Sequence, residues 1–406
     1  MSKASTIAKD FPTAATPDGA ANWRALVDKL LAGKPYADLC HTSDDGIVID
    51  PAPMAQNHIT AHQKHVGGCV LTSLIDSGTV KSANDDILRD LAGGAAALHL
   101  VINIGGTSER GIKVNDKGDL ATLLDGVYLD YIPISIEAGV GQSQAQAMLS
   151  DLYKAKNIEQ PTTSSIGIYG SYYHNLGASE AQELAFMLAS GVTALRQLEA
   201  GGVSVENGAK HLSFHMSLDS DVFMGMAKLR AFRYIWGEAL KAMGTKNQPA
   251  SINVQTSRRM MSNVDIETNI LRTTAASFAA MLGGANSLAV LPYDVAKPSP
   301  DTHRKARRIA RNITIILDEE GHLNNAEDVA TGSYSLESLT AQLAENAWKI
   351  FQMLEYAGGM DKALASGIVE DLISPMVARR KMNILAGNKT IIGVNAFQNP
   401  NEGGAK

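Results

Sequence analysis

Three histidines near residue 60 have a spacing that could support metal chemistry. His58, His62 and His65 stand at positions i, i+4 and i+7, so on a helix their imidazoles would share one face. Imidazole is a common ligand of zinc and other transition metals. No carboxylate lies between these histidines or directly beside them to complete a ligand set. We therefore predict polar histidines and no metal site.

A glycine-rich segment and an arginine pair are further candidates for ligand binding. Residues 105–111 (GGTSERG) lack both the Gly-Lys-Ser/Thr ending and the Gly-x-Gly-x-x-Gly spacing of phosphate loops, so we interpret them as a turn after a strand. Arg258 and Arg259 have the side chains that best pair with phosphate or carboxylate. A structural ion pair is the favoured interpretation, and contact with an anionic ligand such as CoA is the alternative.

The bulk composition excludes several classes of protein. The chain has 406 residues, 45% hydrophobic and 19% charged, which is ordinary for a globular protein with a large core. Its net charge of −6 gives no basic footprint for nucleic acid. No apolar run approaches the roughly 18 residues of a membrane span, and the first residues have no apolar signal-peptide core. Cys40 and Cys69 provide no disulfide framework, so we expect reduced thiols in a cytoplasmic protein.

Apolar runs typical of strands alternate with amphipathic helical patterns over most of the chain. Continuous apolar strands joined by crossover helices predict a parallel sheet, and about eight such units favour a closed barrel. The predicted fold class is α/β, a (β/α)8 TIM barrel, and an open doubly wound sheet is the alternative. The expected strands are residues 59–64, 98–104, 131–137, 165–169, 211–215, 251–255 and 287–291.

Two further regions flank the predicted barrel. Residues 1–56 read as an N-terminal arm for subunit contact, with an amphipathic helix over residues 21–32. Residues 57–388 hold the barrel and a C-terminal helical extension, and residues 389–406 form a polar tail. Loops that follow the barrel strands meet at one end of such a fold, so we expect any site there.

Several ordered motifs resemble one family. GASEAQELA at residues 177–185 precedes Gln255-Thr-Ser and DIETNILRTT at residues 265–274, and Gly393-Val-Asn closes the match. These motifs resemble the adenosylcobalamin-dependent acyl-CoA mutases, above all methylmalonyl-CoA mutase. The resemblance implies a barrel with an arm that wraps a partner subunit. It also places residues 59–64 on the first strand, where the three histidines would divide between two faces.

The resemblance also locates a missing catalytic group. Catalytic members have His-Ser-Gln-Thr-Ser-Gly where this chain has Asn253-Val-Gln-Thr-Ser-Arg258, and their histidine hydrogen-bonds the thioester carbonyl. An asparagine donates hydrogen bonds but does not titrate near neutral pH. We therefore predict no catalytic residue, bulky side chains along the barrel axis, and a vestigial pocket with four candidate residues: Asn253, Gln255, Arg258 and Tyr172.

Other details resemble the small, non-catalytic subunit of these enzymes. Arg259-Met-Met261 follows the Thr-Ser pair, as in that subunit. Asp301-Thr-His303-Arg-Lys-Ala comes close to the cobalamin signature Asp-x-His-x-x-Gly but ends in alanine. We interpret Asp301 as a helix N-cap and His303 as a solvated helix residue. The chain is therefore expected to lack the C-terminal cobalamin-binding domain.

These inferences leave more than one function open. In the first hypothesis the chain is the non-catalytic subunit of a heterodimer. Its large partner binds adenosylcobalamin and converts (R)-methylmalonyl-CoA to succinyl-CoA, and no cofactor is expected on this chain. In the second, it is the catalytic barrel of a split acyl-CoA mutase whose cobalamin-binding domain is a separate chain. An open axial channel exposing Asn253 and Gln255 would favour the second. A third, weaker hypothesis is a CoA-thioester-binding protein without a mutase partner.

Overall fold

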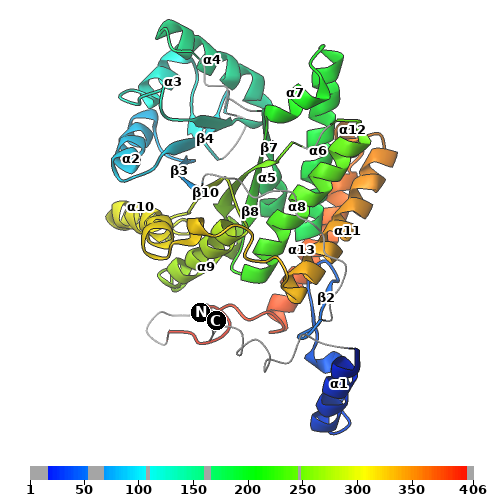
Figure 1. Ribbon diagram of the computed structural model, residues 1–406. Coiled ribbons are helices and arrows are strands. Elements are labelled where there is room, and N and C mark those ends of the chain that lie inside the picture. The colour runs from blue at the N-terminus through cyan, green and yellow to red at the C-terminus, as the bar shows by residue number, and fades with distance from the viewer. Residues whose placement is uncertain (1–16, 54–67, 107–109, 160–165, 246–247, 400–406) are drawn as a thin grey trace, which may run out of the picture.

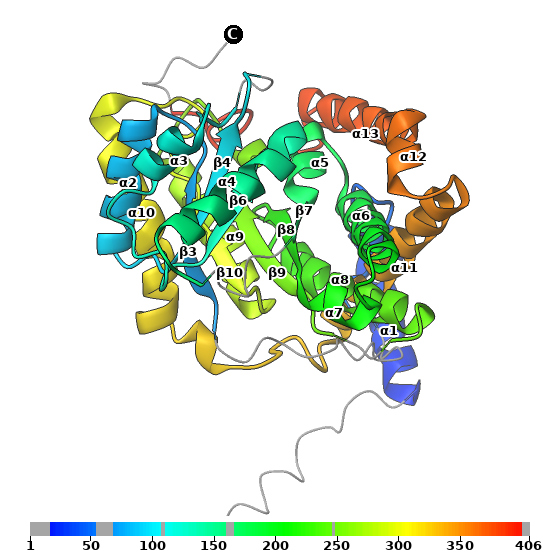
Figure 2. The same cartoon turned by 90° about the horizontal axis from the view of Figure 1, so that it is seen from above.

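A curled parallel sheet forms the centre of the molecule. The computed structural model describes residues 17–53, 68–106, 110–159, 166–245 and 248–399 (Figure 1). The strand order is β5-β4-β3-β10-β9-β8-β7, β6 also pairs with β4, and each of these pairings is parallel. Figure 2 shows the helices around this sheet, which confirms the predicted (β/α)8-like barrel. The strands are β3 (Val70–Ile75), β4 (Ala97–Asn103), β5 (Ile112–Lys113), β6 (Ile134–Glu137), β7 (Ile166–Tyr169), β8 (Leu212–Leu218), β9 (Ser251–Thr256) and β10 (Ser287–Ala289).

Strand β3 was not among the predicted strands. The strand expected at residues 59–64 lies outside the described residues, as do the three histidines near it. β3 carries Thr72 and Ser73 at its centre, and this polar pair interrupts the continuous apolar run expected of a buried parallel strand. The other predicted strands correspond to β4 and to β6 through β10, with their ends shifted by a few residues.

Helices around the sheet begin at local capping signals. α6 (Glu180–Ala200) follows Ser179, and Ser179 and Gln182 form a reciprocal capping box. Thr79 and Ser82 form the same arrangement at the start of α2 (Val80–Ala92). Such caps satisfy N–H groups that have no partner inside the helix, so these helix starts are encoded locally. The other helices around the sheet are α3 (Lys117–Leu123), α4 (Gln142–Ala155), α5 (Gly170–Leu176), α7 (Val205–Lys210), α8 (Val222–Ala242), α9 (Thr268–Leu282) and α10 (Pro300–Ile315).

The largest core lies between the sheet and the C-terminal helical extension. α11 (Tyr334–Tyr356) packs on α6 and α8. α6 and α8 therefore lie between the sheet and α11, and both are apolar around most of their surface. A Cβ on Gly191 would lie 3.0 Å from the Phe214 ring, so glycine allows α6 to approach β8 closely. The extension ends with α12 (Met360–Ala365) and α13 (Ile368–Leu385). None of the described helices combines the length and hydropathy needed to cross a bilayer.

Helix α10 corrects the interpretation of Asp301 and His303. The N-cap is Ser299, whose hydroxyl accepts a hydrogen bond from the N–H of Asp301 at 3.3 Å. Asp301 therefore lies within the first turn of the helix. His303 is half-exposed, but its Nε2 lies 2.6 Å from a carboxylate oxygen of Asp86 on α2. Asp86 and His303 tie two neighbouring helices together, which is a structural role.

The N-terminal arm holds an amphipathic helix away from the barrel. α1 (Pro17–Leu31) lies at the outer end of the arm in Figure 1. Trp23, Leu26 and Leu30 are 38%, 62% and 84% exposed. The arm continues through a short helical turn and the antiparallel strands β1 (His41–Thr42) and β2 (Val48–Ile49). The described part of the chain leaves this apolar stripe uncovered.

The loop between β1 and β2 anchors the arm on the barrel through Asp45. One carboxylate oxygen accepts hydrogen bonds from the Ser179 hydroxyl and, at 3.2 Å, from the N–H of Ala181 at the start of α6. Burial, partly offset by the Ser179 hydrogen bond, raises the pKa of Asp45 from 3.8 to about 6. The folded protein therefore binds the Asp45 proton more tightly than the unfolded chain does. Asp45 thus lowers stability as the pH rises between those two pKa values.

We expect Asp45→Asn to remove this pH dependence. The neutral amide oxygen keeps the acceptor at the start of α6 without a buried charge, so the variant should be more stable than the parent above about pH 6 and similar to it near pH 4. Urea denaturation across this range measures the difference, with Asp28→Asn on the exposed α1 as the control. A variant less stable than the parent at neutral pH would show that the Asp45 carboxylate stabilises the loop.

Candidate functional site

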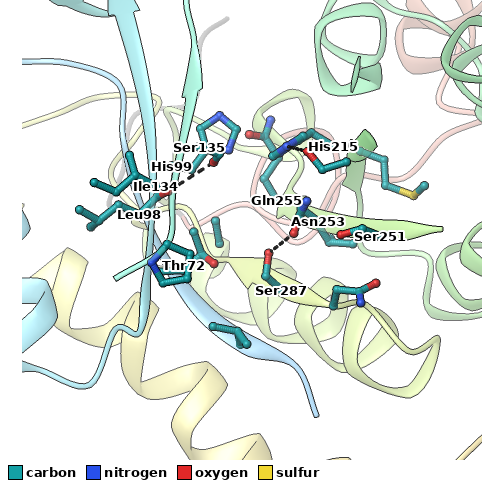
Figure 3. Close-up of a pocket in the computed structure, with 18 residues that line it drawn as sticks. Thr72, Leu98, His99, Ile134, Ser135, His215, Ser251, Asn253, Gln255 and Ser287 are labelled. Atoms are coloured by element: carbon teal, nitrogen blue, oxygen red, sulfur yellow. Dashed lines mark hydrogen bonds between the residues drawn. The ribbon is translucent and has the colours of Figure 1, made fainter. Parts of the chain in front are cut away.

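The barrel axis is hollow in its amino-terminal half. A cavity of about 260 Å³ lies between the amino halves of the strands, and Figure 3 shows the side chains around it. Alternate residues of a strand point to the same side of a sheet, so each strand contributes side chains two positions apart. The polar side chains that line the cavity are Thr72, His99, Ser135, Ser213, His215, Ser251, Asn253, Gln255, Asn286 and Ser287.

Asn253 and Gln255 both line this cavity. The Asn253 Oδ1 accepts a hydrogen bond from the Ser287 hydroxyl at 2.7 Å, across the pair β9 and β10 (Figure 3). The Gln255 amide donates to the Ser217 hydroxyl at 3.2 Å. Both are therefore held by neighbouring strands, with small hydroxyl side chains beside them. These two residues of the predicted vestigial pocket therefore lie in the wall of the same cavity.

Three rings close the cavity toward the carboxyl ends of the strands. His99 of β4 and His215 of β8 have ring centroids 4.9 Å apart, and Tyr169 of β7 lies 4.7 Å from His215. The Tyr169 hydroxyl donates to the carbonyl of Ile136 at 2.6 Å, and burial and the charge of Glu137 raise its pKa. Burial and the neighbouring His99 hold the pKa of His215 well below 6.5, so His215 is neutral at pH 7.

An apolar cluster fills the remaining part of the axis. Leu74, Val101, Ala289 and Leu291 are buried against one another, with Met261 and Val295 packed on them. Leu74 and Val101 lie two positions beyond the cavity-lining Thr72 and His99, so they point to the same side of their strands. The expectation that bulky side chains fill the axis therefore holds in the carboxyl half of the barrel and is wrong in the amino half.

A charged network lies at the carboxyl ends of the strands. Arg110 donates to Asp76 at 3.2 Å and lies 3.9 Å from Glu137, and Arg258 also pairs with Asp76. Burial raises the pKa of Glu137, but the hydrogen bond and charge of His99 and the charge of Arg110 outweigh it and leave that pKa below 4.5. Arg258 is thus part of an ion pair and does not line the cavity.

Tyr172 is separate from the cavity. It lies on α5 with 54% of its surface exposed, and its ring contacts Tyr173 at a centroid distance of 5.4 Å. Neither tyrosine lines the axial cavity. Of the four candidate residues, the structure therefore brings only Asn253 and Gln255 into one pocket.

Sequence reasoning missed a buried hydrogen-bonded series at the end of β9. The Ser257 hydroxyl lies 2.8 Å from Nε2 of His174, whose Nδ1 lies 2.8 Å from Glu183. This order resembles a nucleophile, base and carboxylate. All three residues are fully buried and none lines the axial cavity, so no substrate reaches the serine. Ser257 and His174 lie 83 residues apart, and no local motif signals their contact.

The same cluster has metal-ligand geometry but already contains a cation. Ligand atoms of His174, Glu180 and Glu183 all lie within 4.8 Å of one another. The Lys228 ammonium pairs with Glu180 and donates to Glu183 at 2.6 Å. Burial, and then Arg259 and Lys228, hold the pKa of His174 well below 6.5. The ammonium neutralises the carboxylates, so we interpret the cluster as structural.

Comparison with known proteins gives a consistent family. The family model described as "Methylmalonyl-CoA mutase" matches residues 140–405. The chain is 33% identical over 371 residues to the methylmalonyl-CoA mutase small subunit of Streptomyces virginiae, covering 82% of this chain and 59% of the relative. It is 32% identical over 295 residues to the small subunit of Propionibacterium freudenreichii subsp. shermanii, covering 72% and 46%.

A relative named without a subunit matches a shorter part of the chain. Methylmalonyl-CoA mutase of Escherichia coli is 35% identical over 255 residues, which is 62% of this chain and 35% of the relative. The chain spans about three fifths of the length of the first small subunits that it matches. The identities, the coverage and the barrel agree: the chain belongs to the methylmalonyl-CoA mutase family, among its small subunits.

Proposed function

We propose that this chain is a non-catalytic subunit that supports a catalytic large subunit of the same family. The observation that carries the proposal is the closed carboxyl half of the barrel. Reactions on βα barrels take place at the carboxyl ends of the strands. There the axis is filled by the rings of His99, Tyr169 and His215 and by the apolar cluster around Leu74 and Val101. This filling closes the axis itself, and a space of about 750 Å³ at that end lies between the loops after β8 and β9, α9 and residues 389–394.

The chemistry of the remaining pocket supports the same proposal. Asn253 offers an amide where a catalytic member offers an imidazole, and an amide neither gains nor loses a proton near pH 7. Its oxygen already accepts the Ser287 hydroxyl. Asn253 thus retains hydrogen-bonding capacity without acid–base chemistry.

Two features argue against adenosylcobalamin on this chain. The only cobalamin-like motif in the sequence places His303 on α10, where its Nε2 pairs with Asp86. At the carboxyl ends of β3 and β9, Asp76 pairs with Arg110 and Arg258. We therefore assign the cofactor, and with it the conversion of methylmalonyl-CoA to succinyl-CoA, to the partner subunit of a heterodimer.

The partner interaction is proposed to use the arm. The exposed stripe of α1 has the chemistry of a helix that packs on another protein, and Asp45 anchors the base of the arm on α6. A large subunit that receives this helix would bury leucine side chains now in water, at about 1.5–3 kcal/mol for each one.

We expect the isolated chain to be inactive and to restore mutase activity to a catalytic large subunit. The experiment incubates methylmalonyl-CoA and adenosylcobalamin with this chain, with the large subunit, and with both, and measures succinyl-CoA. Turnover by this chain alone would overturn the proposal. The arm variant Leu26→Asp/Leu30→Asp should fold normally and bind the partner at least about 100-fold more weakly, because two buried leucines are lost.

The axial cavity supports a second candidate function. Asn253 and Gln255 line a cavity of about 260 Å³, and the catalytic barrel of a split mutase would need such a cavity for its substrate. In that case a separate cobalamin-binding chain, added without any large subunit, would make this chain active. The filled carboxyl half argues against this function, since it separates the cavity from the end where a cofactor domain would dock.

A further inference from the structure

We propose that the pocket between α9, the end of α13 and residues 389–394 is a binding site for a small carboxylic acid with a hydrocarbon chain. This inference goes beyond the supporting role and does not depend on it. The pocket has a volume of about 750 Å³, within the range of small-molecule sites. None of the described residues that line it lies on a strand or lines the axial cavity, so it is a different space from that cavity.

Hydrogen bonds fix the segment after α13 against α9. Arg272 of α9 donates to the carbonyl of Ile392 at 2.5 Å. Within the segment, the Asn395 side chain accepts from the N–H of Ile391 at 2.7 Å and donates to the carbonyl of Lys389 at 2.8 Å. These bonds are present without a ligand, so the pocket is already formed and binding loses less conformational entropy.

The charged side chains of the pocket favour an anion. Its described lining holds one carboxylate, Asp219, and four cations: Arg259, Arg272, Arg380 and Lys389. Asp219 lies 3.7 Å from Arg259, and Arg259 and Arg380 each pair with a further carboxylate at 2.9 Å. Arg272 and Lys389 form no ion pair with any residue that the structure describes. These two cations therefore leave the pocket with positive charge.

Arg272 is the group that we expect to contact the carboxylate. Its guanidinium donates to two neutral oxygens, the carbonyl of Ile392 and, at 2.6 Å, the side-chain oxygen of Asn269. Burial lowers the pKa of Arg272, and the charge of Asp265 offsets this only in part. A half-buried guanidinium without a paired carboxylate forms a strong charge-assisted hydrogen bond with an anion that reaches it.

The apolar side chains of the pocket determine the rest of the ligand. Met260, Leu271, Ile384 and Val394 line the same space as the cations. Leu271 is 70% exposed, so its side chain is in water when the pocket is empty. A hydrocarbon chain would remove this apolar surface from water. An inorganic anion would use only the charges, whereas a carboxylic acid with a hydrocarbon chain uses both parts of the pocket.

The probe for this site is hexanoate, and its controls are hexanamide and acetate. Hexanamide has the same number of non-hydrogen atoms but no charge, and acetate has the charge without the longer chain. We expect ligand-observed NMR with the full chain to show hexanoate binding at millimolar concentration and each control binding at least about tenfold more weakly. Hexanamide or acetate binding as tightly as hexanoate, or no binding of hexanoate, would overturn the proposal.

Two variants locate the binding. Arg272→Gln keeps a hydrogen-bonding side chain and removes the charge, so affinity for hexanoate should fall at least about tenfold. Leu271→Asp places a carboxylate in the exposed wall of the pocket and should abolish hexanoate binding. Arg304→Gln on the exposed face of α10 is the matched control and should bind as the parent does. Unfolding midpoints show whether each variant is folded, and a folded Leu271→Asp protein that still binds hexanoate would exclude this pocket.

Discussion

Replacing Lys228 with methionine is expected to lower the free energy of unfolding by about 3–5 kcal/mol. The Lys228 ammonium is fully buried, donates to Glu183 at 2.6 Å and to the carbonyl of Ser217 at 2.8 Å, and pairs with Glu180. Burial alone would lower the pKa of Lys228, but Glu180 and Glu183 outweigh it and raise that pKa. Methionine fills similar space and leaves the buried Glu183 carboxylate without its cation, whereas Glu180 keeps Arg259 at 2.9 Å.

Urea denaturation at neutral pH measures this effect, and Lys349→Met is its control. Lys349 lies 2.7 Å from Glu345, but both side chains are more than 60% exposed, so we expect a change of about 0–1 kcal/mol. Adding Glu183→Gln to Lys228→Met removes one unpaired charge and should recover part of the loss. A Lys228→Met protein as stable as the parent would mean that water or a bound cation replaces the ammonium.

Replacing Asp90 with asparagine is expected to cost a similar amount, about 3–5 kcal/mol. Asp90 on α2 is 2% exposed and pairs with Arg307 and Arg311 of α10, and it accepts the Ser73 hydroxyl of β3 at 2.7 Å. The guanidinium groups are themselves mostly buried. Asparagine has nearly the same shape but no charge, so two arginines would lose their common counter-charge.

The control for Asp90 lies one turn earlier on the same helix. Asp86 pairs with Arg89 and His303, both about 40% exposed, so Asp86→Asn should cost no more than about 1 kcal/mol. Thermal and urea unfolding of both variants give the loss of stability at each site, and both sites lie on the same helix. If both substitutions lowered the free energy of unfolding equally, burial of the Asp90 ion pairs would not explain the loss of stability, and a general effect on helix α2 would.

Both predictions concern charges that hold helices against the barrel wall. Lys228 joins α8 to α6, and Asp90 joins α2 to β3 and α10. Neither group lines the axial cavity. If the chain is a supporting subunit, these charge clusters stabilise the surface that a partner recognises. Substituting Lys228 or Asp90 should then lower the activity of the complex only to the extent that this chain unfolds.

Much of the fold could be predicted from the sequence. Runs such as those of β4 and β8 show continuous apolar character, and Ser179 with Gln182 marks the start of α6, because strand burial and helix caps depend on neighbours in the chain. Strand β3 was not predicted because Thr72 interrupts its apolar run. Thr72 lines the axial cavity, and neighbouring residues in the sequence do not indicate that cavity.

The sequence by itself determined the family and most of the strands and helices, since these are written in consecutive residues. The loss of a catalytic imidazole at Asn253 stays a prediction. Only the tertiary structure decided that the barrel is filled at one end and hollow at the other. His99, Tyr169 and His215 come from three strands far apart in the chain, and they meet because the sheet curls. The same closure brings Ser257 to His174 and Lys228 to Glu183. Contacts of this kind depend on how the sheet curls, which no local spacing encodes.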